Sequence, residues 1–97
     1  MPNVRFRPQA RRDLDEAINF YKSIRKSLAR EFVTASRKAE TKIKRSADSQ
    51  SIYSEPYRYV RLGKFPYIFI FRPDQSDYLV ITVKHTSRDD NYWLSRE

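Results

Sequence analysis

Residues 57–93, with the sequence YRYVRLGKFPYIFIFRPDQSDYLVITVKHTSRDDNYW, decide the fold. Apolar and aromatic residues that favour strands dominate this stretch. Two short segments of turn-forming residues, 62–64 and 72–76, divide it into three runs. No part of the stretch has a helical period. It therefore predicts three consecutive antiparallel strands, over residues 57–62, 65–72 and 77–85, followed by a basic, aromatic tail from 89 to 97.

The third of these strands alternates most regularly, because its apolar residues recur at every second position. Leu79, Ile81 and Val83 are expected on the core face, and residues 78, 80, 82 and 84 on the opposite face. His85 continues the first set and is expected at the end of the strand, where core gives way to surface. We expect any chemistry to be found around that end.

The N-terminal part predicts a short strand and two helices. Residues 3–7 alternate as in a half-buried strand, and Pro8 suits the first turn of a helix. From residue 8 to about 26 the apolar positions follow a helical period, and the members of this stripe are Ala10, Leu14, Ala17, Ile18, Tyr21 and Ile24. Asp13, Asp15 and Glu16 near its start are expected to form a solvated acidic face.

A second helix is expected over residues 28–47, with Ser27 as its N-cap. Its apolar stripe contains small residues at 35, 36 and 39, which would allow close approach of the first helix. The short break between the helices indicates an antiparallel hairpin. Residues 48–56, with the sequence DSQSIYSEP, are expected to form a polar loop.

Together these elements predict one α+β domain over residues 1–97, in the order β-α-α-β-β-β with a short tail. The helical hairpin packs on one face of a small antiparallel sheet. Because the three later strands form a meander, the N-terminal strand must pair with an edge of it. The other sheet face, rich in Tyr and Arg, is expected to remain open for a partner.

The composition limits the classes of function. The chain has 20 Lys and Arg against 12 Asp and Glu, a net charge of +8 and no cysteine. Excess positive charge implies an anionic partner, which can be nucleic acid, a ribosome, a membrane surface or an acidic protein, although solubility alone also explains it. The lack of cysteine excludes disulfides and suits a reducing, cytoplasmic location. We expect no membrane span, metal or cofactor, because the chain has no long apolar run, one histidine and one glycine.

The outer face of the second helix is basic, and its cations are Arg30, Arg37, Lys38, Lys42, Lys44 and Arg45. Such a face can bind a phosphate backbone. It is more often a solvated helix surface.

The end of the third meander strand gathers residues that suit phosphodiester chemistry. His85 can act as general base or acid, and Tyr92 as an acid, because metal-free RNA cleavage needs both. Arg61 and Arg88 can stabilise negative charge in the transition state. We expect Arg58 and Arg61 near His85. A single histidine at a strand end can instead be purely structural.

Other basic and aromatic residues of the same region are candidates for contacts with a partner or nucleic acid. They are Arg58, Lys64, Tyr67, Arg72, Lys84 and Trp93. For Trp93 two alternatives remain, packing back on the core or contacting a partner. Exposed tyrosines such as Tyr67 can stack bases.

Three segments give the chain a family resemblance. FRPQARRDLDEAINFY at 6–21, VRLGKFPYIFIF at 60–71 and VITVKHTSRDDNYW at 80–93 resemble the RelE/ParE superfamily of toxins from type II toxin–antitoxin systems. The resemblance implies a small cytoplasmic toxin that inhibits growth and is neutralised by an acidic, partly disordered antitoxin, which folds as it binds.

The superfamily has two activities. RelE-like members cleave mRNA in the ribosome, and ParE-like members inhibit DNA gyrase and are not nucleases. Arg61, Gly63 and His85 match the RelE-like pattern, whereas Tyr59, Pro66 and Thr86 replace its arginines. The resemblance therefore favours a ParE-like, plasmid-stabilisation type of toxin. The alternatives are a ribosome-dependent mRNA interferase and, more distantly, a non-toxic basic nucleic-acid-binding module.

Overall fold

The computed structural model describes residues 2–88 and 91–97, so Asp89 and Asp90 of the expected tail lie outside the described residues. Its elements follow the chain in this order: β1 (Val4–Phe6), α1 (Pro8–Ile24), α2 (Lys26–Ser46), a 3₁₀ turn η1 (Ala47–Ser49), β2 (Ser51–Ser54), β3 (Tyr57–Arg61), β4 (Tyr67–Asp74), β5 (Asp77–His85) and a second 3₁₀ segment η2 (Tyr92–Arg96).

The strands form one five-stranded sheet in the order β1-β5-β4-β3-β2. Strands β3, β4 and β5 form the expected antiparallel meander, and β1 joins its β5 edge in parallel, with Arg5 opposite Leu79. The prediction of an α+β fold with an N-terminal strand at a meander edge is thus confirmed. The crossover from β1 to β5 contains both helices, which explains why a parallel pair is possible here.

Three local expectations were wrong. Part of the expected polar loop forms strand β2, which pairs with β3 through Ile52 and Arg58. Ser27 does not cap α2, because the helices are separated by a single extended residue, Arg25. Ile24 was assigned to the apolar stripe, yet its side chain is 57% exposed at the end of α1.

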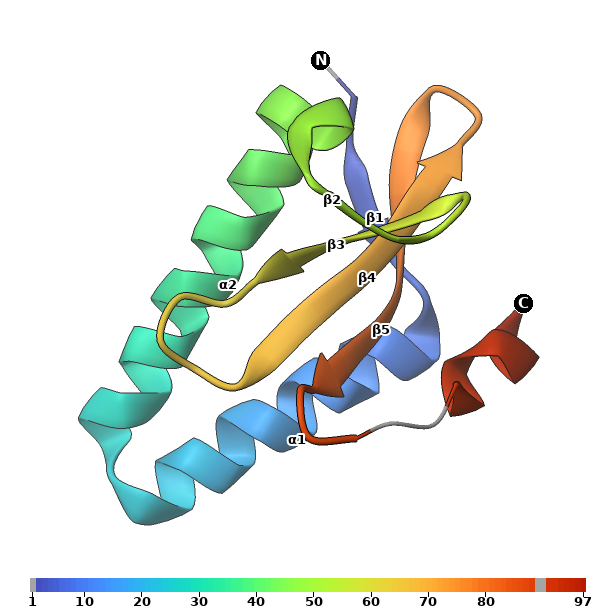
Figure 1. Cartoon of the computed structure of the whole chain (residues 1–97). Coiled ribbons are helices and arrows are strands. Elements are labelled where there is room, and N and C mark those ends of the chain that lie inside the picture. Colours follow the sequence, from blue (N-terminus) through green and yellow to red (C-terminus); the bar gives the residue numbers. More distant parts are fainter. Residues whose placement is uncertain (1, 89–90) are drawn as a thin grey trace.

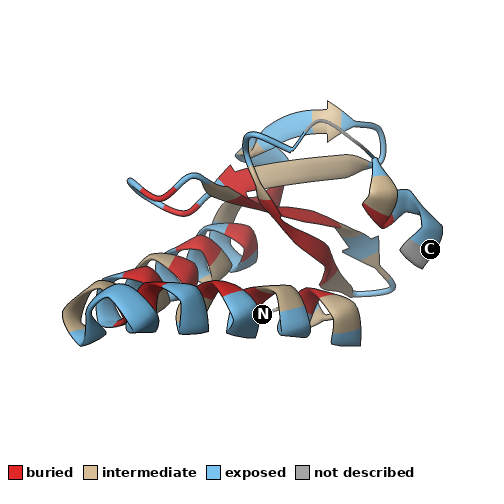
Figure 2. Cartoon of the chain, turned by 90° about the horizontal axis from the view of Figure 1, so that it is seen from below, coloured by how far each residue is buried: buried red, intermediate tan, exposed pale blue. Residues whose placement is uncertain are grey.

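Both helices cover the same face of the sheet, here called the helix face (Figures 1 and 2). They meet at Arg25 and diverge as the two arms of a V (Figure 1). Leu14 and Tyr21 of α1 and Phe32 and Ile43 of α2 are buried against the sheet. On α2, Ala35 lies against the turn after β3, and Gly63 in this turn has a φ of 57°, in the left-handed region that favours glycine.

A β-bulge changes the faces of β5. Between β4 and β5 the register passes from Ile70 opposite Thr82 to Phe71 opposite Val80, so that Ile81 is the extra residue. Val80 and Val83 therefore both belong to the core under the helices, while Ile81 points to the opposite side. The expectation that every second residue of β5 shares one face was wrong for this reason.

The face of the sheet opposite the helices, here called the tail face, carries a second buried cluster. Ile68, Ile70, Leu79 and Ile81 lie on it, and Trp93 of η2 covers them with no exposed surface. Tyr53 and Tyr57 pack edge-on against the indole, with ring centroids 5.6 and 4.9 Å away. The expectation that this face remains open for a partner is therefore wrong where the tail lies.

Glu97 fastens the tail at the end of η2. Its carboxylate accepts hydrogen bonds from Arg72 Nε at 2.6 Å, Arg7 Nη2 at 2.8 Å and the Tyr57 hydroxyl at 2.8 Å. These contacts join the tail to β4, to β3 and to the residue before α1. The bonds from Arg72, followed by those from Arg7 and Tyr57, lower the pKa of Glu97 from 4.5 to about 2.

Trp93→Ala should destabilise the protein by about 3–5 kcal/mol, because it removes the largest buried side chain of the tail face and leaves a cavity. Leu94→Ala is the matched control, since Leu94 is the next residue of η2 and is 45% exposed. Urea unfolding measures both. Equal losses for the two variants would contradict the packing role of Trp93.

Glu97→Gln should lower stability at neutral pH by about 2 kcal/mol, because it weakens charge-assisted hydrogen bonds. The pKa of Glu97 is lower in the folded than in the unfolded chain. Its contribution is therefore complete above pH 4.5 and disappears as the pH falls through about 2. The difference between wild type and variant should shrink over this range in urea unfolding, and Asp15→Asn, at an exposed position of α1, is the control. A difference independent of pH would contradict the role of Glu97.

Candidate functional site

A small hollow lies where β5 ends, between α1 and the tail. Its volume is about 170 Å³. Three of the four residues expected to cleave RNA line it, namely His85, Arg88 and Tyr92. The remaining lining residues are Asp13, Glu16, Ala17, Tyr67 and Val83. The expectation that chemistry-bearing residues gather at this strand end is met by these three.

His85 stands at the last position of β5 and is held from two sides. It pairs with Tyr67 across the sheet, and the two rings meet edge to face at 5.1 Å. Its Nδ1 accepts a hydrogen bond from the Ser87 backbone N–H at 3.1 Å and lies 2.7 Å from the Ser87 hydroxyl. These contacts fix the orientation of the imidazole. Burial raises the pKa of Tyr67, which therefore stays neutral over the physiological range.

Arg88 and Tyr92 form a stacked pair on the tail side of the hollow. The Arg88 guanidinium lies 3.6 Å from the centre of the Tyr92 ring, which is a cation–π contact. The Tyr92 hydroxyl is 3.2 Å from Thr82 Oγ1, and Thr82 in turn donates to Asp13 Oδ2 at 3.1 Å. The chain of contacts ties the tail to β5 and α1.

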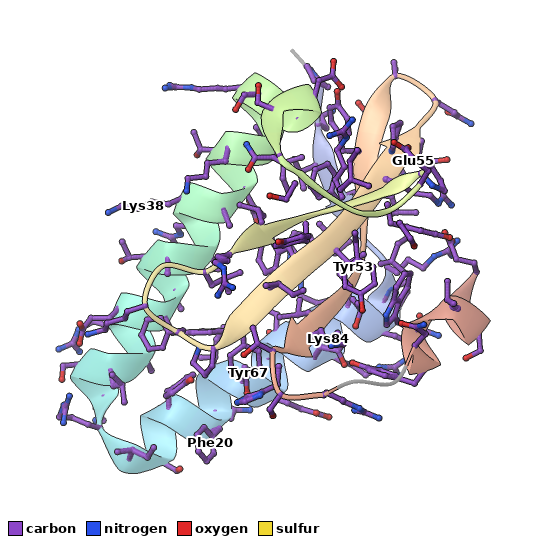
Figure 3. All side chains as sticks on the ribbon, in the orientation of Figure 1. Phe20, Lys38, Tyr53, Glu55, Tyr67 and Lys84 are labelled. Atoms are coloured by element: carbon purple, nitrogen blue, oxygen red, sulfur yellow. The ribbon has the colours of Figure 1, made fainter. Side chains whose placement is uncertain are left out.

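Lys84 stabilises the segment after β5 that carries Arg88. Its side chain is buried on the tail face, and its ammonium group donates a hydrogen bond to the Arg88 carbonyl. Figure 3 shows Lys84 near the end of β5, with Tyr67 close to α1. Lys84 was expected to contact a partner; in the structure its charge serves the loop that carries Arg88.

Arg61, the fourth expected catalytic residue, is not part of the hollow. It pairs with Ile68, and Ile68 pairs with Lys84, so Arg61 lies two strands, or roughly 10 Å, from β5. Arg61 also lies on the tail face, because its partner Ile68 does. His85 lies on the helix face, because its partner Tyr67 packs against the core there. Arg61 instead lines a groove of about 570 Å³ between α2 and the turn after β3.

Arg58 was also expected near His85, and this was wrong. Strands two apart in a meander run in the same direction, so the start of β3 and the end of β5 lie at opposite ends of the sheet. Arg58 pairs with Phe71, far from His85 along β4, and donates to the Gln50 carbonyl at 2.7 Å.

The other expected partner-binding residues have varied surroundings. Arg72 donates a hydrogen bond to Glu97. Trp93 packs on the core and is buried, so it does not present a surface to a partner. Lys64 remains largely exposed, although its ammonium lies 2.8 Å from Glu31 on α2. Tyr67 packs on the core with its ring 5.4 Å from Phe32. Lys64 is thus the most accessible member of this set.

Asp13 is the residue of the hollow whose role the sequence analysis missed. Its Oδ2 accepts from Thr82 Oγ1 and, at 3.3 Å, from the Val83 backbone N–H. On the β1 side of β5, the position of Val83 lies beyond the residues that pair with β1. The signal was its position three residues after Ala10 and four before Ala17, at the border of the buried stripe of α1.

Neither a metal site nor a membrane-spanning helix is found in residues 2–88 and 91–97. No group of three or more His, Cys, Asp or Glu side chains there is arranged to hold a metal ion. Within the same part of the chain, no helix is long and apolar enough to cross a membrane.

Comparison with protein families matches residues 4–90 to the model described as ParE toxin of type II toxin-antitoxin system, parDE. The chain belongs to the ParE toxin family. It is thus a toxin of the type II toxin–antitoxin class, whose partner is an antitoxin, and the suspected RelE/ParE relationship is confirmed. This membership favours a toxin over the non-toxic binding module.

A solved structure of the same family name has the same fold. A chain of the "Chromosomal ParDE TA system from P. aeruginosa" superposes with a TM-score of 0.75 over 88% of this chain and 96% of that chain, at 19% identity. No curated protein sequence matches the chain significantly. The sequence of this chain thus differs widely from that of the solved chain, while the fold is the same.

Asp13→Ala should destabilise this ParE toxin by about 1–3 kcal/mol, because it leaves the Val83 N–H without its acceptor. Asp15→Ala, two residues further along α1 at an exposed position, should change stability by less than about 0.5 kcal/mol. Thermal or urea unfolding compares the two variants. Similar effects would show that Asp13 acts only through the general charge of α1.

Proposed function

We propose that this ParE toxin inhibits growth by acting on DNA gyrase and does not cleave RNA. The observation that carries the proposal is the separation of Arg61 from His85, on opposite faces of the sheet and two strands apart. Without Arg61, the cations left at the hollow are those of Arg88 and, when protonated, His85. The proposed action takes place in the cytoplasm, where gyrase works.

The charges of the hollow also support a function other than cleavage. Asp13 and Glu16 line it together with His85 and Arg88, so that carboxylates face the position a phosphodiester would occupy. Like charges repel, and the negative transition state of RNA cleavage would gain little stabilisation there. With about 170 Å³, the hollow is also smaller than the roughly 300 Å³ at which ordinary ligand pockets begin.

The test is a DNA supercoiling reaction with purified gyrase, run beside the mapping of transcript ends minutes after expression without antitoxin. We expect loss of supercoiling in vitro, a DNA-damage response in cells and intact transcripts. Transcripts cut within translated codons, together with unaffected supercoiling, would refute the proposal.

The second candidate is a ribosome-dependent mRNA interferase, which the convergence of His85, Arg88 and Tyr92 at one hollow supports. The two candidates differ in the response to His85→Ala. A gyrase inhibitor should remain toxic, because this change removes an edge-to-face ring contact and leaves the core intact. Loss of toxicity with unchanged stability and antitoxin binding would instead indicate catalysis by His85. Ser87→Ala, which removes a neighbour of the ring and no proton-transfer group, is the control.

For the antitoxin we propose an acidic, partly disordered segment that folds on the groove between α2 and the turn after β3. The floor of this groove is apolar and consists of Ala35, Ala39 and Phe65. Cations of both walls also line it, namely Arg30, Lys38, Lys42, Arg61 and Lys64, together with one acid, Glu31, which pairs with Lys64. An amphipathic acidic segment suits such a surface, because it offers apolar anchors and complementary charge at once.

A further inference from the structure

Most of the net charge of the toxin is concentrated on α2. Seven basic residues and two acidic ones lie between Lys26 and Ser46, which gives this helix +5 of the total of +8. Charge of this density creates a strong local field that attracts polyanions. The sequence analysis left open whether this face is merely solvated.

The cations form a stripe on the side of α2 opposite the core. The buried side of the helix contains Phe32, Ser36 and Ile43. The opposite side, here called the outer stripe, consists of Arg30, Thr34, Arg37, Lys38, Thr41, Lys44 and Arg45, all exposed. Figure 3 shows Lys38 pointing away from the sheet. With a rise of 1.5 Å per residue, the stripe from Arg30 to Arg45 is about 22 Å long.

The charges of the outer stripe are not neutralised within the protein. Among the described residues, none of its basic side chains forms an ion pair, whereas Arg5, Arg7, Arg72 and Lys64 all do. Glu31, an acidic residue of α2, pairs with Lys64 and not with a cation of the outer stripe. Five cations are therefore presented to solvent in one row.

We propose that the outer stripe of α2 binds the phosphate backbone of duplex DNA. This inference rests on the proposed action at gyrase, an enzyme that holds duplex DNA, and it identifies a contact of the toxin with that DNA. Arginine and lysine side chains on one helix face suit successive phosphates, and the Thr34 hydroxyl adds a further donor. The Thr41 hydroxyl is already used, since it donates to the Arg37 carbonyl at 3.1 Å.

The composition of the stripe argues against a protein as its occupant. Protein interfaces depend on buried apolar or aromatic anchors. The exposed large hydrophobic side chains of the described part are Phe20, Ile24, Ile52 and Leu94, and none lies on α2. The groove beside α2 differs in this respect, because Ala35, Ala39 and Phe65 form its floor. Arg30, Thr34 and Arg37 of the stripe also line a groove between α1 and α2, whose apolar members Ile18, Ala29 and Val33 are buried or half-buried. The outer stripe itself consists of basic residues and threonines, which is the pattern of a phosphate-binding surface.

The experiment measures binding of the full chain to a fluorescent 24-base-pair duplex of arbitrary sequence between 50 and 200 mM salt. The test variant is Arg37→Gln with Arg45→Gln, which removes two cations that do not line the groove. Each lost phosphate contact lowers the slope of log K against log salt by about 0.9, so the slope should fall by roughly 2 and the affinity by at least about ten-fold.

The control variant is Arg11→Gln with Arg12→Gln, which removes the same charge from exposed positions of α1. Its affinity should stay within about three-fold of wild type, because only the general field changes. Equal losses in both variants would overturn the proposal, and so would unchanged binding of the α2 variant. Tighter α2-dependent binding of a poly-glutamate peptide or of an RNA duplex of equal charge would also overturn it, in favour of those partners.

Inhibition of gyrase separates this inference from the proposed function. If wild type inhibits supercoiling while duplex binding does not depend on α2, the inference alone fails. If the duplex binds through α2 while gyrase is unaffected, the proposed function fails and the DNA contact stands. If both hold, the α2 variant should need more protein for half-inhibition, and the difference should shrink as the salt concentration rises, because wild type has the steeper salt dependence.

Discussion

Burial of strands β4 and β5 on both of their faces is the constraint on which the rest of the structure depends. Phe69 and Phe71 of β4 point to the helices, and Ile68 and Ile70 point to the other side. A sheet that is apolar on both faces must be covered on both. The helices cover one face over its length. The short tail covers the other with a single large residue, Trp93 (Figure 2 shows the layers).

This constraint explains how the charges of the protein are divided. Covering the tail face requires the tail to stay in place, and Glu97 with Arg7 and Arg72 holds it there. Arg7 and Arg72 therefore stabilise the folded position of the tail. Lys84 likewise stabilises the segment that carries Arg88, because it donates a hydrogen bond to the Arg88 carbonyl. Helix α2 contributes to the core through one side only. Its other side is exposed to solvent, and cations without an ion-pair partner among the described residues lie there.

The hollow at the end of β5 contains three of the four residues that were candidates for RNA cleavage, together with two carboxylates. His85, Arg88 and Tyr92 meet there because β5 ends beside both α1 and the tail. The same arrangement brings Asp13 to the Val83 N–H, where a carboxylate completes the backbone hydrogen bonding beyond the end of β1. Satisfying that edge thus places negative charge beside the cations, which suits packing and binding better than cleavage of a phosphodiester.

The sequence by itself determined the order of the elements other than strand β2, the meander, most of the buried stripes of the helices and the basic outer face of α2. These features follow from periodicity and turn residues, which are local properties. The family resemblance rested on the same local motifs. The sequence also indicated that His85 would stand at the end of β5, because it is the last residue of the predicted strand 77–85.

Only the tertiary structure decided which residues share a face, a hollow or an ion pair. The bulge at Ile81 reversed the alternation of β5, and one extra residue in a strand leaves no local signature in so apolar a run. Strand β2 is polar and depends on its partner β3 rather than on its own propensity. Arg61 and His85 were separated by strand order and face, and Glu97 reached Arg7 across 90 positions of sequence. Such contacts arise from the packing of distant segments, which no local pattern encodes.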